Sequence, residues 1–444
     1  METIPRFYCN LINTFADLIN RLQHKLTILL ITCWGLFFYS CSTPTAVVNQ
    51  NLSYTYDKDQ TYLHPQYVLF NKNDSITSVY VRISASELLF AQSPNSRFPF
   101  SKYSVSLRLQ NNLENRTLVD SSSVSIVFSD SIRAEFYYTY LEIKARKGGK
   151  YALIAQFSDN NRNQFIQSQF PLERSRSFNL NDMMITAVGD TMPLFAQTPD
   201  SDQTIRLRCN YPPTTGAYVA ELYRKEFPLP APPFAMVEPA VFDINPDSTF
   251  YITDENLNNL TLKSKGIYWI KRKSDDNGGF CIFRYYDGYP NINSSDNMIA
   301  PLRYLSSKQE FREITEGSNK RAGMETFWTE CAGSQDRARE LIKIYYNRVK
   351  EANVYFNSYL EGWKTDRGLV YVIFGPPNIV YRNSSNEQWI YGAENNMMSL
   401  SFTFLKMDNP FTDNDYSLSR NGTYKNTWYQ AVDSWRQGRV WLDN

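Results

Sequence analysis

The chain has 444 residues, which is enough for two to three domains. Hydrophobic residues make up 42% of it and charged residues 20%, so the composition describes a globular chain with a sizeable core and excludes disorder as the main state. The formal net charge of +1 lacks the positive excess that a nucleic-acid-binding surface needs, so no nucleic-acid partner is predicted.

The start of the sequence has the pattern of a secretory signal. Two basic residues precede an uncharged apolar run over 26–39, and Cys41 follows a small residue, as at a lipid-attachment site. Fourteen helical residues span only about 21 Å, less than a hydrocarbon core of about 30 Å, so a retained transmembrane anchor is the weaker alternative. We predict a lipoprotein-type signal peptide over 1–40, lipid attachment at Cys41 and a tether over 41–60. A plain cleaved signal remains open.

Removal of this leader would lower Lys plus Arg from 46 to 43 and Asp plus Glu from 45 to 43, a net charge of about zero. The remaining cysteines other than Cys41 are Cys209, Cys281 and Cys331, which allow at most one disulfide. His64 would be the only histidine left. With a single histidine, a catalytic triad or a histidine-ligated metal site is not expected. Neither a metal site nor a cofactor is predicted.

The region 61–176 reads as an antiparallel β-sandwich-like domain. Its short runs of β-branched and aromatic residues are separated by Asn, Ser, Asp and Gly clusters, and no helical pattern of convincing length interrupts them. The predicted strands cover residues 67–70, 78–83, 103–109, 124–128, 134–143, 151–157 and 164–170.

A second β-rich domain is predicted over 177–295. Its strands are expected at 184–188, 204–209, 217–225, 248–252, 266–272 and 280–286. The segment 227–239 contains five prolines and is therefore an exposed loop or edge segment.

The last region, 296–444, is predicted to be an α+β domain. Helical material is expected over 297–315 and 320–331, followed by an amphipathic helix over 335–359 whose apolar residues recur every three or four positions. Ser334 fits its N-cap, and Gly362 fits the left-handed position that ends helices. We expect this helix to pack on its own sheet, although a coiled-coil seam is the alternative.

The rest of this domain is expected to be mostly sheet. Residues 369–374 are almost wholly apolar, which favours a strand buried on both faces, and the Gly-Pro-Pro that follows would end it. Further strands are predicted at 388–391, 400–405 and 416–419, with a short closing helix over 427–436.

Several motifs of this domain resemble the GWxTD domain family. They comprise Phe327-Trp328, Ala338-Arg339, Tyr346 to Val349, Glu351 to Asn353, Phe356, Glu361 to Gly368, Gly375 to Pro377, Glu387 to Tyr391 and Trp435 to Gly438. The resemblance implies a secreted or lipid-anchored protein of the kind common in Bacteroidota, with β-rich N-terminal regions and no established activity. Because residues 42–46, directly after Cys41, contain no acidic residue, the resemblance also favours the periplasmic face of the outer membrane over the cell surface.

The residues that give the family its name have a structural interpretation. Trp363 would pack over the end of the preceding helix, Thr365 and Asp366 would accept backbone N–H groups of the next turn, and Gly368 would permit a sharp entry into a strand. On this interpretation, Gly362 to Gly368 form a junction, and Arg367 belongs to it.

Two functional alternatives remain for the same region. Asp366 and Glu387 could be a carboxylate pair for hydrolysis of a substrate such as a glycan, with Arg367 or Arg382 orienting the substrate. Alternatively, aromatic side chains could form a platform for sugar or peptide; the candidates are Trp389, Tyr391 and Tyr381.

We favour a protein that is not an enzyme. In this hypothesis a lipid-anchored envelope protein serves as a binding or scaffold component and recognises another outer-membrane or periplasmic protein. A hydrolase or carbohydrate-binding protein acting on glycans is the alternative.

Overall fold

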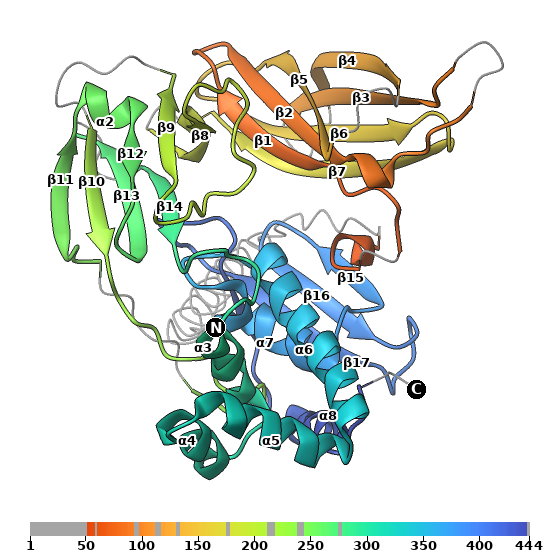
Figure 1. Cartoon of the computed structure of the whole chain (residues 1–444). Coiled ribbons are helices and arrows are strands. Elements are labelled where there is room, and N and C mark those ends of the chain that lie inside the picture. The colour runs from red at the N-terminus through yellow and green to blue at the C-terminus, as the bar shows by residue number, and fades with distance from the viewer. Residues whose placement is uncertain are drawn as a thin grey trace, which may run out of the picture. The chain divides into compact units, whose positions relative to one another are not determined.

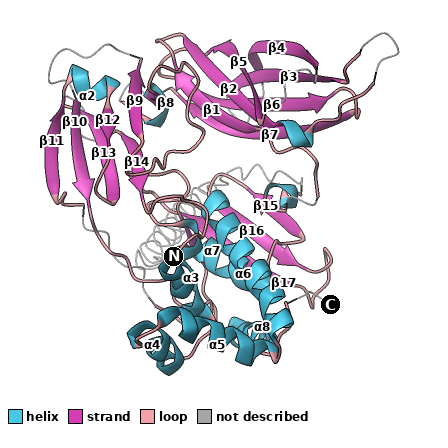
Figure 2. Cartoon of the chain, viewed as in Figure 1, coloured by secondary structure: helices cyan, strands magenta, loops and turns pink. Residues whose placement is uncertain are grey.

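The structure is a computed structural model, which describes residues 51–57, 60–92, 97–111, 117–129, 134–174, 178–210, 218–237, 244–273 and 278–441. The predicted signal peptide, Cys41 and most of the predicted tether lie outside these residues. Figure 2 shows that strands dominate the first part of the chain and helices the last part. The predicted order of all-β regions followed by an α+β region is confirmed.

The first β-rich part forms two antiparallel sheets, with strand orders β1-β2-β5 and β4-β3-β6-β7. The strands are β1 (Gln66–Asn71), β2 (Ile76–Ser84), β3 (Phe100–Asn111), β4 (Thr117–Ser129), β5 (Phe136–Lys144), β6 (Lys150–Asp159) and β7 (Gln164–Glu173). Alternate residues of β3, such as Val105 and Leu107, are fully buried against side chains of the other sheet, as expected for a sandwich. Short 3-10 turns, η2 (Ala85–Glu87) and η3 (Leu180–Asp182), follow β2 and β7.

The second β-rich part contains the sheets β12-β9-β8 and β11-β10-β13-β14. Its elements are β8 (Met183–Ala187), β9 (Thr204–Cys209), β10 (Tyr218–Tyr223), β11 (Ser248–Ile252), α2 (Asp254–Asn258), β12 (Leu260–Thr261), β13 (Gly266–Arg272) and β14 (Phe280–Arg284). The sequence did not predict α2 and β12. Phe411, from the last part of the chain, packs on the larger sheet against Tyr223 and Trp269.

Helices open the C-terminal part, as predicted. They are α3 (Ser295–Ile299), η4 (Ala300–Tyr304), α4 (Lys308–Glu316), α5 (Lys320–Ala332) and α6 (Gln335–Tyr355). Ser334 caps α6 by accepting a hydrogen bond from the Arg337 amide. The predicted end of this helix is wrong, because α6 stops at Tyr355 and Gly362 begins a separate 3-10 turn, η5 (Gly362–Lys364), without a left-handed φ.

The predicted strand over 369–374 is also wrong. Residues Asp366–Phe374 form a helix, α7, in which every residue from Arg367 onward is buried. An apolar run this short has no periodicity that separates a buried strand from a buried helix. The polar groups at the end of α7 are satisfied inside the core: Arg348 donates to the Ile373 carbonyl at 3.1 Å, and Trp435 Nε1 donates to the same oxygen at 3.0 Å.

The sheet of the C-terminal part has the order β15-β16-β17-β18 and is antiparallel. Its strands are β15 (Ile379–Arg382), β16 (Asn386–Tyr391), β17 (Leu400–Lys406) and β18 (Tyr416–Leu418), and α8 (Tyr424–Arg436) follows. The predictions for the last three strands and the closing helix are confirmed, whereas β15 was not predicted. One hydrophobic core joins α5, α6, α7, α8 and this sheet.

A short N-terminal segment, residues 51–57, belongs to the same core. It contains the 3-10 turn η1 (Ser53–Thr55), which lies beside β15 in Figure 1. The Leu52 amide donates to the Val380 carbonyl at 2.9 Å, so the segment extends the edge of the sheet. Tyr56 is 4% exposed and packs against Phe356 and Trp389.

Candidate functional site

The segment Gly362 to Gly368 joins α6 to α7 through backbones in direct contact. A Cβ atom on Gly362 would lie 1.9 Å from the Ala352 carbonyl oxygen, and one on Gly368 would lie 2.0 Å from the Gly362 carbonyl oxygen. Real Cβ atoms do not approach an oxygen so closely, so only glycine fits at both positions. The two glycines therefore set how closely η5 lies against the helices on either side.

Trp363 and Thr365 hold this junction with hydrogen bonds. The Trp363 side chain is 2% exposed, its amide donates to Asn353 Oδ1 at 3.2 Å, and its indole donates to Glu361 at 2.7 Å. Trp363 thus packs at the C-terminal end of α6. The Thr365 hydroxyl accepts from the Gly368 amide at 3.0 Å, which makes Thr365 the N-cap of α7.

Asp366 does not cap the next turn. Its carboxylate accepts from the Leu418 amide at 2.7 Å and forms an ion pair with Arg420 at 2.5 Å. Arg420 in turn donates to the Ala231 carbonyl at 3.2 Å. Asp366 therefore ties the first turn of α7 to β18 and to the proline-rich segment.

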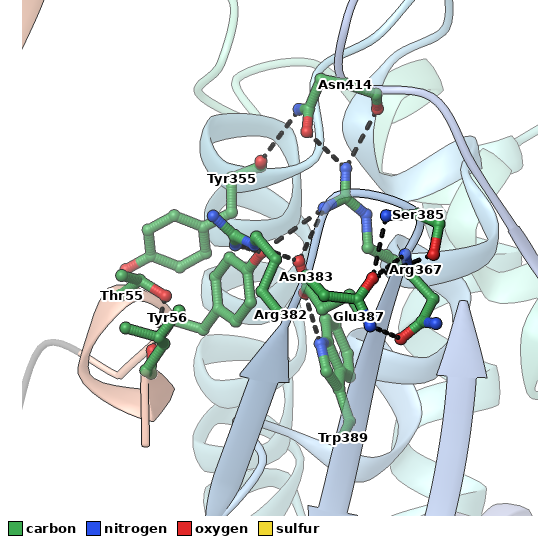
Figure 3. A network of polar contacts seen from close by, with 12 residues as sticks. Thr55, Tyr56, Tyr355, Arg367, Arg382, Asn383, Ser385, Glu387, Trp389 and Asn414 are labelled. Carbon is green, nitrogen blue, oxygen red and sulfur yellow. Dashed lines mark hydrogen bonds and ion pairs between the residues drawn. The ribbon is translucent and has the colours of Figure 1, made fainter. Parts of the chain in front are cut away.

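Arg367 belongs to a buried polar cluster, which Figure 3 shows. Arg382 and Glu387 are cross-strand neighbours on β15 and β16, and Arg382 Nε donates to Glu387 at 2.7 Å. Arg367 Nη1 lies 3.6 Å from the same carboxylate oxygen. Glu387 is fully buried and Arg367 is 2% exposed, whereas the Arg382 side chain is 37% exposed, so a buried and a partly exposed guanidinium group share one buried carboxylate.

Further hydrogen bonds and a cation–π contact satisfy the charged groups of this cluster. Trp389 Nε1 donates to the second Glu387 oxygen at 2.6 Å. Arg367 donates to the Asn414 carbonyl at 3.0 Å, and its guanidinium lies 4.0 Å from the centre of the Tyr416 ring. Charges removed from water in this way are tolerated because each one has a partner.

Electrostatics keep Glu387 ionised. Burial alone would raise the pKa of its carboxyl group, but the charges of Arg382 and Arg367 and the hydrogen bonds from Trp389 and Tyr56 hold the pKa below its ordinary value. Burial also raises the pKa of the Tyr56 hydroxyl, which therefore stays protonated. An enclosed carboxylate whose pKa is lowered suits an ion pair better than proton transfer.

Tyr56 closes the cluster from the other end of the chain. Its hydroxyl accepts from Arg382 Nη2 at 2.6 Å and lies 3.4 Å from Arg367 Nη1. The Tyr371 hydroxyl, on α7, donates to the Tyr56 carbonyl at 2.9 Å. Asn414 plays a similar part, since its amide donates to the Asn357 carbonyl just beyond α6 at 2.8 Å. The cluster thus joins the N-terminal segment, both helices of the junction and the sheet.

The residues proposed as an aromatic platform do not form an exposed surface. Trp389 is fully buried and Tyr391 is 2% exposed, with its hydroxyl donating to the Gly375 carbonyl at 2.8 Å. Tyr381 is partly exposed and bonded to Glu394. The burial of Trp389 and Tyr391 contradicts the platform hypothesis for these two residues, because other core side chains cover their ring faces.

The proposed catalytic pair is not assembled either. Asp366 is held by Arg420, and Glu387 is held by Arg367 and Arg382, so the two carboxylates have different partners. Within the described ranges, no three His, Cys, Asp or Glu side chains are grouped to hold a metal ion. The thiols of Cys209, Cys281 and Cys331 are free. No helix of the described part is long and apolar enough to cross a bilayer.

Sequence reasoning missed Tyr56, Asn414 and Arg420. Their partners lie far away in the chain: 311 positions separate Tyr56 from Arg367, and 54 separate Arg420 from Asp366. No short motif marks such pairs. The sequence does contain a signal for one contact of this cluster. Glu387 and Trp389 are two positions apart at a predicted strand, and residues two apart in a strand point to the same side of a sheet.

Comparison with protein families gives a match to the C-terminal part of the chain. Residues 266–437 match the GWxTD domain. The match begins at β13, before the predicted boundary at 296, and Tyr285 and Tyr289 from this added stretch hydrogen-bond to the end of α6 and to the residues after it.

The other comparisons add nothing to the fold. Comparison with curated proteins gives no match. Among solved structures, a C-terminal 282-residue fragment of intimin, determined in complex with the intimin-binding domain of the translocated intimin receptor, is 8% identical and covers 81% of this chain and 94% of the fragment. Its TM-score of 0.14 is too low to bear on the fold. The family match and the motifs placed above together show that residues 266–437 of this chain form a GWxTD domain.

Proposed function

We propose that this protein is a lipid-anchored component of the cell envelope that binds or scaffolds other proteins and is not an enzyme. Cys41 would carry the lipid, the outer membrane would be its location with the periplasmic face favoured, and another outer-membrane or periplasmic protein would be its partner. The observation that carries the non-catalytic part is the burial of Glu387, which is fully enclosed and held by two arginines. A substrate cannot reach this carboxylate without opening the core.

The binding role is tested in membranes that contain the full-length protein. Crosslinking followed by mild detergent extraction is expected to recover the protein with a defined envelope partner. A Cys41→Ala variant is expected to lose both fatty-acid labelling and partition into the membrane. Recovery of a monomer with no partner would contradict the scaffold role, and continued labelling of the Cys41→Ala variant would contradict the lipid site.

The structural role and the hydrolase alternative make different predictions for Glu387→Gln. If Glu387 holds the core together, the variant loses stability by about 3–5 kcal/mol, because two guanidinium groups lose their shared counter-charge. Urea unfolding measures this loss. Glu394→Gln, at an exposed carboxyl, is the matched control and is expected to change stability by less than about 0.5 kcal/mol.

A catalytic role would have the opposite signature. Asp366→Asn and Glu387→Gln would then leave the unfolding midpoint unchanged and abolish a hydrolytic activity on glycans. That result would overturn the non-catalytic proposal.

A further inference from the structure

The two most exposed large hydrophobic side chains of the described residues are neighbours. Met397 is 101% exposed and Met398 is 89% exposed relative to reference values. Both lie in the turn between β16 and β17, residues 392–399, which we call the methionine loop. Single exposed apolar residues are ordinary on protein surfaces. Two consecutive methionines that are fully exposed to water, however, suggest a contact surface for a membrane or for another protein.

The methionine loop is held in a defined shape. The Ser399 amide donates to the Asn396 carbonyl at 3.0 Å, and the Ser399 hydroxyl donates to the Ala393 carbonyl at 2.9 Å. Asn396 Oδ1 accepts from the Met398 amide at 3.0 Å. The methionines are therefore presented outward by a closed turn with local hydrogen bonds.

The loop borders a groove of about 830 Å³ on the same side of the domain. Leu400, Tyr424, Val440 and Trp441 line it together with both methionines, and polar residues such as Thr427, Gln430 and Arg439 complete the lining. The methionine loop thus forms one wall of a groove with a mixed polar and apolar lining. Methionine side chains are flexible and polarisable, which suits contact with an irregular apolar medium.

The N-terminal segment enters the domain beside this loop. The Asn51 side chain donates to the Asn378 carbonyl at 3.1 Å and accepts from the Val380 amide at 3.0 Å. Asn378 Oδ1 in turn accepts from the Gly392 amide at 2.9 Å, at the start of the methionine loop. The first described residue and the loop are therefore both hydrogen-bonded to Asn378, the former to its backbone carbonyl and the latter to its side chain.

The length of chain before Asn51 limits how far this end can be from a lipid on Cys41. Nine residues separate the two positions, and fully extended they reach about 35 Å at most. If Cys41 is acylated, Asn51 is tethered within that distance of the lipid, and the methionine loop starts at Gly392, which is hydrogen-bonded to the same residue as Asn51. Contact with the bilayer is then intramolecular, so a weak apolar contact becomes populated without strong affinity of its own.

We infer that the methionine loop is a second membrane contact, in which Met397 and Met398 insert into the boundary between headgroups and acyl chains. This inference rests on the proposed lipid anchor at Cys41. The only charged residue of the loop is the acidic Glu394, so the attraction is apolar and does not require anionic lipids.

The test uses the full-length acylated protein in phosphatidylcholine vesicles that contain a fraction of nitroxide-labelled lipid. An environment-sensitive fluorophore is attached to Met398→Cys or, as a control, to Met236→Cys in the proline-rich segment, where the native side chain is 79% exposed. The unsubstituted protein measures background labelling of the three native thiols. Both substituted positions are exposed, so folding is preserved.

The label at position 398 is expected to shift to the blue and to lose at least twofold more fluorescence to the lipid nitroxide than the label at position 236. Replacing part of the phosphatidylcholine by phosphatidylglycerol should not strengthen the effect. An acylated, vesicle-bound protein whose two labels are equally exposed to water would overturn the inference and leave the anchor intact. Absence of fatty acid on Cys41 would overturn both the lipid anchor and the membrane contact. Shielding of position 398 only after an envelope protein is added would overturn the membrane contact and indicate a protein partner.

Discussion

Gly362 and Gly368 lie against backbone atoms and not against flexible side chains. Their neighbours are carbonyl oxygens of Ala352 and of Gly362 itself, in segments that are hydrogen-bonded along their length. A clash with such atoms cannot be relieved by a change of rotamer, so the helices must move apart. The glycines of the family motif are explained by packing alone.

Alanine at either glycine is expected to destabilise the protein by about 3 kcal/mol, at the upper end of the usual range for overpacking, because the neighbour is backbone. Gly422→Ala is the control, since a Cβ atom there meets nothing within 4 Å. Urea unfolding of the three variants measures the difference. Equal stability of all three would contradict the close packing of η5 on α6.

The hydrogen-bonding role of Thr365 could be predicted from the sequence, because a cap contacts amides two or three positions away. The partners of Arg367 could not be predicted. A guanidinium reaches residues brought together by the whole fold, and the sequence near Arg367 contains none of them. The motif therefore indicated a turn correctly, without indicating that its arginine enters a buried cluster.

Among the elements, α7 differs most from the sequence prediction. Thr365 as N-cap and Gly375 with a φ of +87° mark the two ends of this helix, and both were visible as a threonine before the apolar run and a glycine after it. The fully apolar composition favoured a strand, since neither face is polar. In a helix enclosed on all sides, the ends are more informative than the periodicity.

Helices α4 and α8 are joined by an ion pair that should respond to pH. Glu310 accepts from Arg436 at 2.7 Å and also forms a capping box with Ser307. The hydrogen bond from Arg436, followed by smaller contributions from Ser307, lowers the pKa of Glu310 to about 2 from 4.5 despite partial burial. Because the folded-state pKa is the lower one, the ionised carboxylate stabilises the fold above about pH 4.5, and this stabilisation is lost as the pH falls towards 2.

Glu310→Gln is expected to cost about 1 kcal/mol at pH 7, since the pair is about one-third exposed and partly screened by solvent. The difference from the unsubstituted protein should shrink as the pH is lowered from 4.5 towards 2. Unfolding in urea at several pH values measures it. Glu316→Gln, on the same helix but 73% exposed, should show little difference at any pH, and a constant cost for Glu310→Gln would contradict the assignment to charge.

Across the whole molecule, the described part of the chain begins and ends in one hydrophobic core. Tyr56 packs in the core that also contains Trp435, although two β-rich regions lie between them in the sequence. The β-rich regions could be predicted because alternation along a strand is local. The contribution of residues 51–57 could not, because this segment has no such pattern and was assigned to the tether.

Tyr56→Ala is expected to destabilise the GWxTD domain by about 3–5 kcal/mol, as for other large buried aromatic residues. Tyr56→Phe should cost about 1–2 kcal/mol, because Arg382 loses a buried acceptor. Hydrogen exchange should show lost protection in α7 and β16 and unchanged protection in β3 and β6. Tyr62→Ala, at a side chain that is 64% exposed, is the control; equal loss of protection in β3 would contradict the placement of Tyr56.

The position of Tyr56 also has a consequence for the order of synthesis. A chain that emerges from its N-terminus exposes Tyr56 long before Arg367, Arg382 and Glu387 have been made. The first β-rich region can fold in that interval from contacts of its own, whereas the larger sheet of the second still lacks Phe411. The last domain cannot close until residues 51–57 and the segments around Arg367, Arg382 and Glu387 are all present. A nascent chain that ends before α7 would therefore have residues 51–57 without their core partners. A protease would cleave this exposed segment more readily than in the finished protein.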